Sequence, residues 1–110
     1  MRIIIITQCT TLGDLFDKAR SMADEGLEIF ADIEQAIDLI RDSTGWPRPT
    51  RNFHIFLDVQ GLRDDKKKRL KRIAKAEEVP AGNIRLDDLF GGAQHHYLRD
   101  WLTDLERRRR

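Results

Sequence analysis

The sequence contains a single cysteine, Cys9, among its 110 residues. One thiol excludes an internal disulfide and a metal site built from several thiolates, and it is typical of reducing compartments. Long apolar runs are also missing, because the longest one, residues 3–6, is far shorter than the roughly 20 residues that span a membrane. We therefore expect a cytoplasmic protein without a membrane segment.

Glycine and proline are scarce too, with seven and three residues, which argues against long disordered segments. The chain is 40% hydrophobic and 35% charged, which is the composition of a globular protein with a strongly charged surface. Its length is that of one domain. We predict a single α/β domain over residues 1–110, in which residues 107–110 form a disordered basic tail.

The apolar positions alternate between the spacing of strands and the spacing of helices. An unbroken β-branched run at 2–7 predicts a strand covered on both faces, the kind found inside a parallel sheet. Thr10 or Thr11 is expected to cap the first helix, Gly26 to end it, and Asp32 to cap the second. The remaining predicted strands lie at 27–31, 53–59 and 83–86, and the remaining helices at about 62–78 and 93–107.

The resulting order, β-α-β-α-β-α-β-α, indicates a short, mainly parallel sheet of four strands with right-handed crossovers and helices on both faces. A central first strand favours the strand order 2-1-3-4, as in flavodoxin-like folds. A C-terminal helix completes this three-layer domain. The two edges of such a sheet favour pairing with a second copy of the chain or with another protein.

Open α/β sheets bind their ligands beyond the carboxyl ends of the strands, at the point where the strand order reverses. In this chain that point lies between the first and third strands, which gives two catalytic candidates, Asp58 and Cys9. The ligand-binding candidates are polar and glycine residues of the two adjoining loops: Gln8, Thr10, Thr11, Gln60 and Gly61. No residue pattern indicates a metal or a cofactor.

Asp58 and Cys9 each have two interpretations. Asp58 ends an apolar strand and is either a phosphoacceptor, metal ligand or general base, or a carboxylate that caps the following loop or pairs with Arg63 or a nearby lysine. Cys9 precedes a helix whose dipole favours a thiolate, yet a lone cysteine also suits a small buried position. His54 shares the strand face of Asp58, but a separation of about 13 Å along the strand excludes direct contact between them.

The segments FLDVQG (56–61) and LEIFADIEQAIDLI (27–40) resemble those of response-regulator receiver domains. The resemblance implies a flavodoxin-like fold with Asp58 at the phosphoacceptor position. Receivers carry acidic residues after the first strand to hold magnesium, whereas this chain has Thr7, Gln8 and Cys9 there. The resemblance therefore suits either a relative that does not undergo phosphorylation or an unrelated chain that has converged on the same fold.

Basic side chains are concentrated in the second half of the chain. Residues 1–50 carry 5 basic and 9 acidic side chains, and residues 51–110 carry 15 and 10. On a helix, the six basic residues of segment 66–72 cannot share one face. They form either a phosphate-binding surface for nucleic acid, together with Arg107–Arg110, or a solvated helix surface. The six are Lys66, Lys67, Lys68, Arg69, Lys71 and Arg72.

These observations favour a non-catalytic regulatory or protein-interaction module with a receiver-like fold, which we expect to form a homodimer. Two alternatives stay open. One is a nucleic-acid-associated protein that uses segment 66–72 and the arginine tail. The other is a small enzyme, or a binder of a phosphorylated or nucleotide ligand, with its site at the first-strand crevice.

Overall fold

A parallel sheet of four strands forms the middle layer of the molecule, and its order is β2-β1-β3-β4. The order 2-1-3-4 predicted from the sequence is confirmed. The computed structural model describes residues 1–9, 11–46, 52–59, 63–89 and 97–109. The strands are β1 (Arg2–Ile6), β2 (Leu27–Phe30), β3 (Phe53–Asp58) and β4 (Ile84–Asp87).

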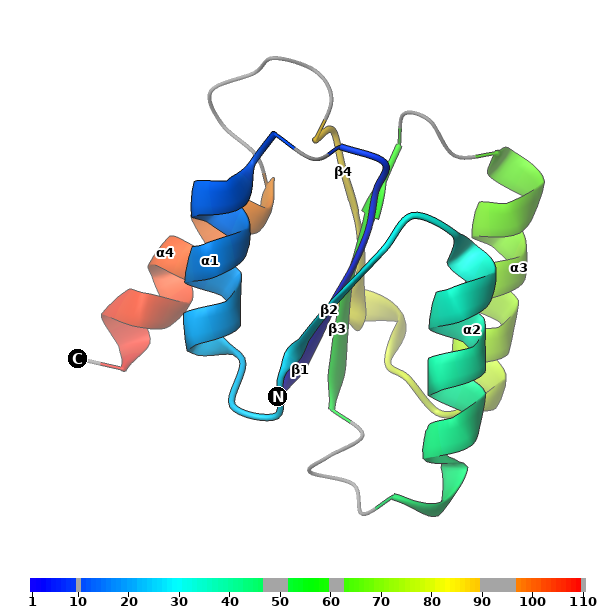
Figure 1. The fold of residues 1–110 in the computed structure, drawn as a ribbon. Coiled ribbons are helices and arrows are strands. Elements are labelled where there is room, and N and C mark those ends of the chain that lie inside the picture. Colours follow the sequence, from blue (N-terminus) through cyan, green and yellow to red (C-terminus); the bar gives the residue numbers. More distant parts are fainter. Residues whose placement is uncertain (10, 47–51, 60–62, 90–96, 110) are drawn as a thin grey trace.

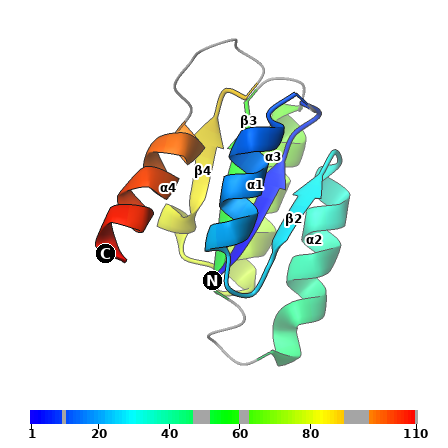
Figure 2. The ribbon, with the colours of Figure 1, turned by 60° about the vertical axis from the view of Figure 1, so that its left-hand side comes forward.

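Helices cover both faces of the sheet (Figure 1). Helices α1 and α4 pack together on one face, and α2 and α3 pack together on the other. In Figure 2, α4 lies beside β4 at one margin of the molecule and α2 beside β2 at the opposite margin. The helices are α1 (Gly13–Met22), α2 (Ile33–Asp42), α3 (Asp64–Ala76) and α4 (Tyr97–Arg108).

Strand β1 lies between β2 and β3, and its apolar run Ile3–Ile6 is completely buried. Because side chains alternate along a strand, Ile4 and Ile6 join the core beneath α2 and α3, whereas Ile3 and Ile5 join the core beneath α1 and α4. The continuous apolar sequence of this strand is thus explained by two separate cores, one on each face of the sheet.

Helix α2 begins as predicted, because the Asp32 carboxylate accepts a hydrogen bond of 3.0 Å from the Glu34 N–H. Helix α1 differs from the prediction. Leu12 is its N-cap residue and supplies no side-chain cap, while the Thr11 hydroxyl lies 3.3 Å from the Cys9 sulfur. The other predicted cap, Thr10, lies outside the described residues. The prediction for Thr11 was wrong because its hydroxyl contacts the Cys9 sulfur and does not accept a hydrogen bond from the first N–H groups of the helix.

The helix ends also differ from the predicted ones. Helix α1 stops at Met22, and Gly26 instead serves the turn into β2, with a φ of +112°. Helix α3 ends at Ala76, and Glu78 adopts a left-handed conformation with a φ of 63°, which a glycine would adopt more readily. No helix in the described part of the chain combines the length and apolar character needed to cross a bilayer.

Candidate functional site

Asp58, the last residue of β3, lies at the carboxyl edge of the sheet and is 0% exposed. The Thr7 hydroxyl, just beyond β1, donates a hydrogen bond of 2.6 Å to Asp58 Oδ2. The Leu89 N–H, just beyond β4, donates one of 3.3 Å to Asp58 Oδ1. Both carboxylate oxygens therefore accept hydrogen bonds from within the protein, and the side chain links the ends of three strands.

Thr7 extends this network into the loop that follows β1. Its hydroxyl oxygen accepts a hydrogen bond of 3.0 Å from the Cys9 N–H while it donates to Asp58. The path from Cys9 through Thr7 to Asp58 fixes the backbone of this loop against β3. The predicted meeting of the first and third strand ends is thus present, and the bonds formed there are internal to the protein.

The other residues predicted for this crevice have different surroundings. Cys9 is only 6% exposed and packs with the apolar core beneath α1 and α4. The side chains of Gln8 and Thr11 are exposed. Two further candidates, Gln60 and Gly61, lie outside the described residues, as Thr10 does. Among the described residues, no three His, Cys, Asp or Glu side chains are grouped so as to hold a metal ion.

A second buried carboxylate, Asp87 at the end of β4, is adjacent to Asp58 in the sheet register. Its Oδ1 accepts hydrogen bonds from the Asp88 and Tyr97 N–H groups at 2.8 and 3.1 Å, and its Oδ2 accepts one of 2.9 Å from Leu98 N–H. Asp87 therefore caps the N-terminus of α4, where helix N–H groups need acceptors and favour a negative charge.

The basic segment 66–72 divides into two groups in the structure. Lys66 lies 3.6 Å from the carboxylate of Asp32, and Arg69 forms an ion pair with Glu34, so both serve the contact of α3 with α2. Lys67 is 9% exposed and donates a hydrogen bond of 2.6 Å to the Val59 carbonyl. Three of the six nucleic-acid candidates thus have structural partners.

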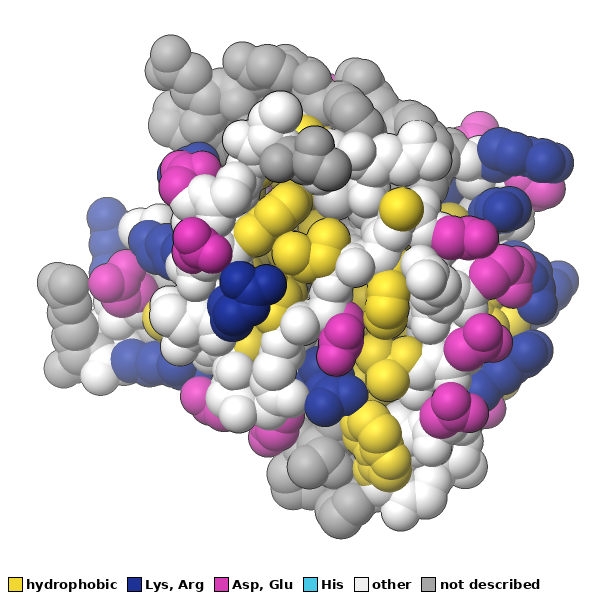
Figure 3. Space-filling view, in the orientation of Figure 1, with side chains coloured by type: hydrophobic (Ala, Val, Ile, Leu, Met, Phe, Trp, Pro, Cys, Tyr) yellow, Lys and Arg dark blue, Asp and Glu magenta, His cyan; other side chains and the backbone are white. Residues whose placement is uncertain are grey.

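The remaining basic residues of α3 share one helix face. Lys68, Lys71, Arg72 and Lys75 are all exposed and have the i, i+3, i+4, i+7 spacing that places side chains on one side of a helix. Within the described part of the chain, none of these four forms an ion pair. We call these four residues the basic stripe. Figure 3 shows Lys and Arg side chains at the right-hand margin, on the side of α3, with Asp and Glu side chains next to them.

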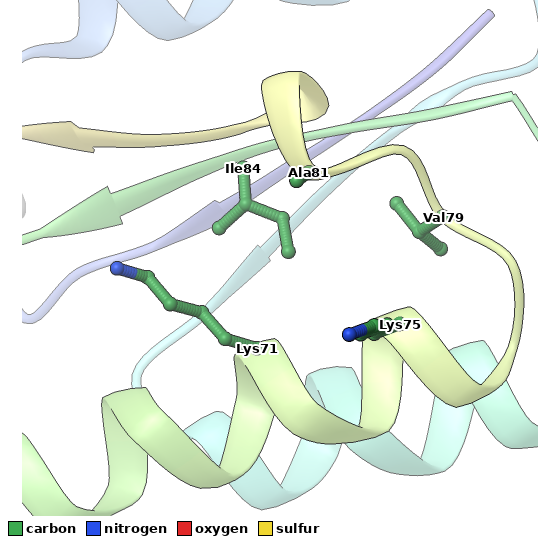
Figure 4. Close-up of a pocket in the computed structure, with 5 residues that line it drawn as sticks. All are labelled: Lys71, Lys75, Val79, Ala81 and Ile84. Carbon is green, nitrogen blue, oxygen red and sulfur yellow. The ribbon is translucent and has the colours of Figure 1, made fainter.

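Beside the basic stripe, a pocket of about 500 Å³ lies between α3 and β4. Lys71 and Lys75 stand on one side of it, and the apolar side chains of Val79, Ala81 and Ile84 lie on the other (Figure 4). Leu86 is two residues beyond Ile84, on the same face of β4, and is 49% exposed. We call this pocket, together with Leu86, the α3–β4 groove.

His54 lies on the opposite face of the sheet, against α4. Its Nδ1 is 3.1 Å from a guanidinium nitrogen of Arg85, and its ring stacks on Trp101 at 5.1 Å between centroids. The same guanidinium lies over the rings of Trp101 and Phe56, at 5.1 and 5.4 Å. The pKa of His54 is lowered to about 4, chiefly by burial and to a smaller extent by the positive charges of Arg85 and the N-terminus. A neutral imidazole can therefore accept the Arg85 hydrogen bond.

Comparison of the chain with protein-family models, with curated proteins and with solved structures finds no significant match.

Proposed function

We propose that this chain is a non-catalytic protein-interaction module with a receiver-like architecture. The observation that carries the proposal is the burial of Asp58, whose two carboxylate oxygens accept hydrogen bonds from Thr7 and Leu89. A phosphoacceptor or general base has to reach its substrate, and displacing these bonds would leave buried polar groups without partners. The geometry favours a carboxylate that holds strand ends together.

The residues at the end of β1, the strand beside that of Asp58, support the same conclusion. A receiver that transfers a phosphoryl group needs a divalent cation held by oxygen ligands, chiefly carboxylates. At the end of β1 this chain has Thr7, Gln8 and Cys9, and the Thr7 oxygen is already engaged with Asp58 and with the Cys9 N–H. A chain of this kind keeps the architecture of the sheet and uses its outer surface for recognition.

A phosphorylation assay tests the non-catalytic part of the proposal. The purified protein is incubated with acetyl phosphate and magnesium, and its intact mass is measured beside that of an active receiver domain. We expect no phosphoryl adduct on this chain. An adduct that forms on the wild type and is lost in Asp58→Asn would overturn the proposal and restore Asp58 as a phosphoacceptor.

The α3–β4 groove is the surface that supports the interaction part. Leu86 is one of the large apolar side chains that stay exposed, and β4 pairs on one side only with β3 within the described residues. Selection from a displayed library of random peptides tests this part without assuming a partner. A recognition module is expected to enrich families of related peptides, and a selection that enriches none contradicts the proposal.

A second candidate function, nucleic-acid binding, is favoured by the basic stripe alone. It predicts affinity that decreases steeply with salt, with a logarithmic slope of up to about −4 if all four side chains contact phosphates. Charge reversal of Lys68, Lys71 and Arg72 would then abolish binding, while reversal of the buried Lys67 would chiefly affect folding. Fluorescence anisotropy with labelled single- and double-stranded oligonucleotides over a salt series decides this candidate.

Self-association stays a separate prediction. In the described part of the chain, both outer strands, β2 and β4, have one neighbour each, and Figure 3 shows apolar side chains along the β2 side between α1 and α2. Such edges favour pairing with another chain. Light scattering over a range of concentrations measures the mass directly, and a monomer at every concentration would contradict the prediction.

A further inference from the structure

We infer that the α3–β4 groove binds an acidic segment of a partner protein, which places an apolar side chain on the groove floor and carboxylates against Lys71 and Lys75. This inference rests on the proposed function, because it assigns a partner chemistry to the surface of an interaction module. Its basis is the combination of an open apolar floor with one rim of unpaired positive charge.

The floor of the groove is open because β4 is only partly covered: Ile84 packs against the core beneath α2 and α3 but is only partly buried, and Leu86 is 49% exposed. Helix α3 buries Leu70, Ile73 and Ala74 against the core that contains Ile55 and Leu57 of β3. On β4, the neighbour of Leu57 in the register is Leu86, which stays half exposed. An apolar side chain of a partner would complete this layer and remove apolar surface from water.

In the described part of the chain, the charged side chains that line the groove are both basic. Lys71 and Lys75 line it, and Lys68 and Arg72 extend the basic stripe along α3. These four differ from Lys66 and Arg69, which α2 neutralises through Asp32 and Glu34. A patch of uncompensated positive potential attracts acidic partners and excludes basic ones. The charge therefore selects an acidic occupant.

Two other occupants fit the groove less well. A second copy of the chain that docked through the same face would bring its own basic stripe against this one, and like charges across an interface are unfavourable. A single-stranded nucleic acid usually stacks its bases on aromatic rings. Trp101, Tyr97 and Phe56 lie on the α4 side of the sheet, and Trp46 stacks under Arg2. No described aromatic residue lines the groove.

The peptide selection described above, repeated with variants, tests the inference. We expect the enriched peptides to combine acidic and apolar residues. The leading peptide is then labelled, and its affinity is measured by fluorescence anisotropy for the wild type, for the double variant K71E/K75E and for Leu86→Asp. The matched control is R20E/R41E, which changes the net charge equally at exposed positions on α1 and α2.

We expect K71E/K75E to weaken binding by about tenfold or more, Leu86→Asp by about fivefold, and R20E/R41E by less than about twofold. Circular dichroism and urea denaturation establish that each variant is folded. Enriched peptides that lack acidic residues, or that bind K71E/K75E as tightly as the wild type, overturn the inference but leave the proposed interaction function in place.

Two further outcomes separate the hypotheses. A selection that enriches no peptide contradicts the proposed function itself, whatever the groove binds. Binding of an RNA oligonucleotide that K71E/K75E abolishes, in the absence of any peptide binding, assigns the groove to nucleic acid and also overturns the inference. The results therefore distinguish failure of the inference alone from failure of both proposals.

Discussion

Thr7 and Asp58 lie 51 positions apart in the chain, and the Thr7 hydroxyl donates a buried hydrogen bond of 2.6 Å to the Asp58 carboxylate. The bond joins the carboxyl ends of β1 and β3 at the point where α/β sheets commonly bind ligands. In this chain the residues described at that point, Thr7, Cys9, Asp58 and Leu89, form hydrogen bonds with one another. Thr7, which lies beyond a different strand, therefore supplies one of the hydrogen bonds that hold the buried Asp58 carboxylate.

Removal of the Thr7 hydroxyl is expected to destabilise the protein. In Thr7→Val the shape is nearly kept, but Asp58 Oδ2 loses the hydrogen bond from the Thr7 hydroxyl, and the Cys9 N–H loses its bond to the same oxygen. We expect the free energy of unfolding to decrease by about 2 to 3 kcal/mol. Urea denaturation measures it. Thr7→Ser keeps the hydroxyl and serves as the control, and a Thr7→Val protein as stable as Thr7→Ser would contradict a structural role for this bond.

The sequence predicted the parts of the fold that depend on local patterns. The continuous run Ile3–Ile6 required a strand covered on both faces, and this placed β1 inside the sheet. The Asp32 cap was predictable because the carboxylate and its partner, the Glu34 N–H, are two residues apart. In both cases the determining neighbours are close in sequence or are set by the alternation of helices and strands.

The features that sequence reasoning missed depend on distant partners. Asp87 caps a helix that begins ten positions later, so no local capping pattern marks it. The basic stripe could not be predicted, because the six basic residues of segment 66–72 look alike in sequence. They differ only in their contacts, since Lys66 and Arg69 pair with acidic residues at the start of α2. The sequence pattern predicted that Asp58 lies at the carboxyl edge of the sheet, but whether that carboxylate accepts internal hydrogen bonds depended on Thr7 and Leu89.

Replacement of Asp87 is expected to loosen α4 before it unfolds the sheet. Asp87→Ala removes the acceptor of three backbone N–H groups, two of them in the first turn of α4. We expect the free energy of unfolding to decrease by about 2 kcal/mol. Hydrogen exchange is expected to be faster at Leu98 and Leu102 than in β1. Asp100→Asn, an exposed acidic residue in the same turn, is the matched control. Equal protection of α4 in Asp87→Ala and the wild type would contradict this assignment.

The low pKa of His54 predicts that acid weakens the fold. The folded state binds the proton with a pKa of about 4, whereas the unfolded state binds it near 6.5. Between these pH values the unfolded state carries more protons, so stability is complete above pH 6.5 and decreases as the pH falls towards 4. Solvent screening of this half-buried group reduces the loss to about 1 to 2 kcal/mol.

The difference between the wild type and His54→Gln isolates the contribution of His54, because glutamine does not titrate. Urea denaturation at a series of pH values gives the free energy of unfolding of both proteins. The wild type is expected to lose more stability than His54→Gln between pH 6.5 and 4. Parallel pH profiles for the two proteins would show that the pKa of His54 is the same in the folded and unfolded states.

Adjacent lysines on α3 are expected to separate folding from binding. Lys67 is buried and donates a hydrogen bond of 2.6 Å to the Val59 carbonyl, whereas Lys68 is exposed and belongs to the basic stripe. Lys67→Met leaves that carbonyl without its donor and is expected to cost about 1 to 2 kcal/mol of stability, while Lys68→Met costs less than about 0.5 kcal/mol.

The effects on binding are expected to be reversed. Lys68→Met should lower the affinity for the acidic peptide, because it removes a charge from the basic stripe. Lys67→Met should leave this affinity unchanged in the folded protein. Urea denaturation and fluorescence anisotropy on the same two variants measure both properties. The opposite result would contradict this prediction. If Lys67→Met weakens peptide binding and Lys68→Met does not, the peptide contacts the positive charge of Lys67, beside the end of β3, and not the basic stripe.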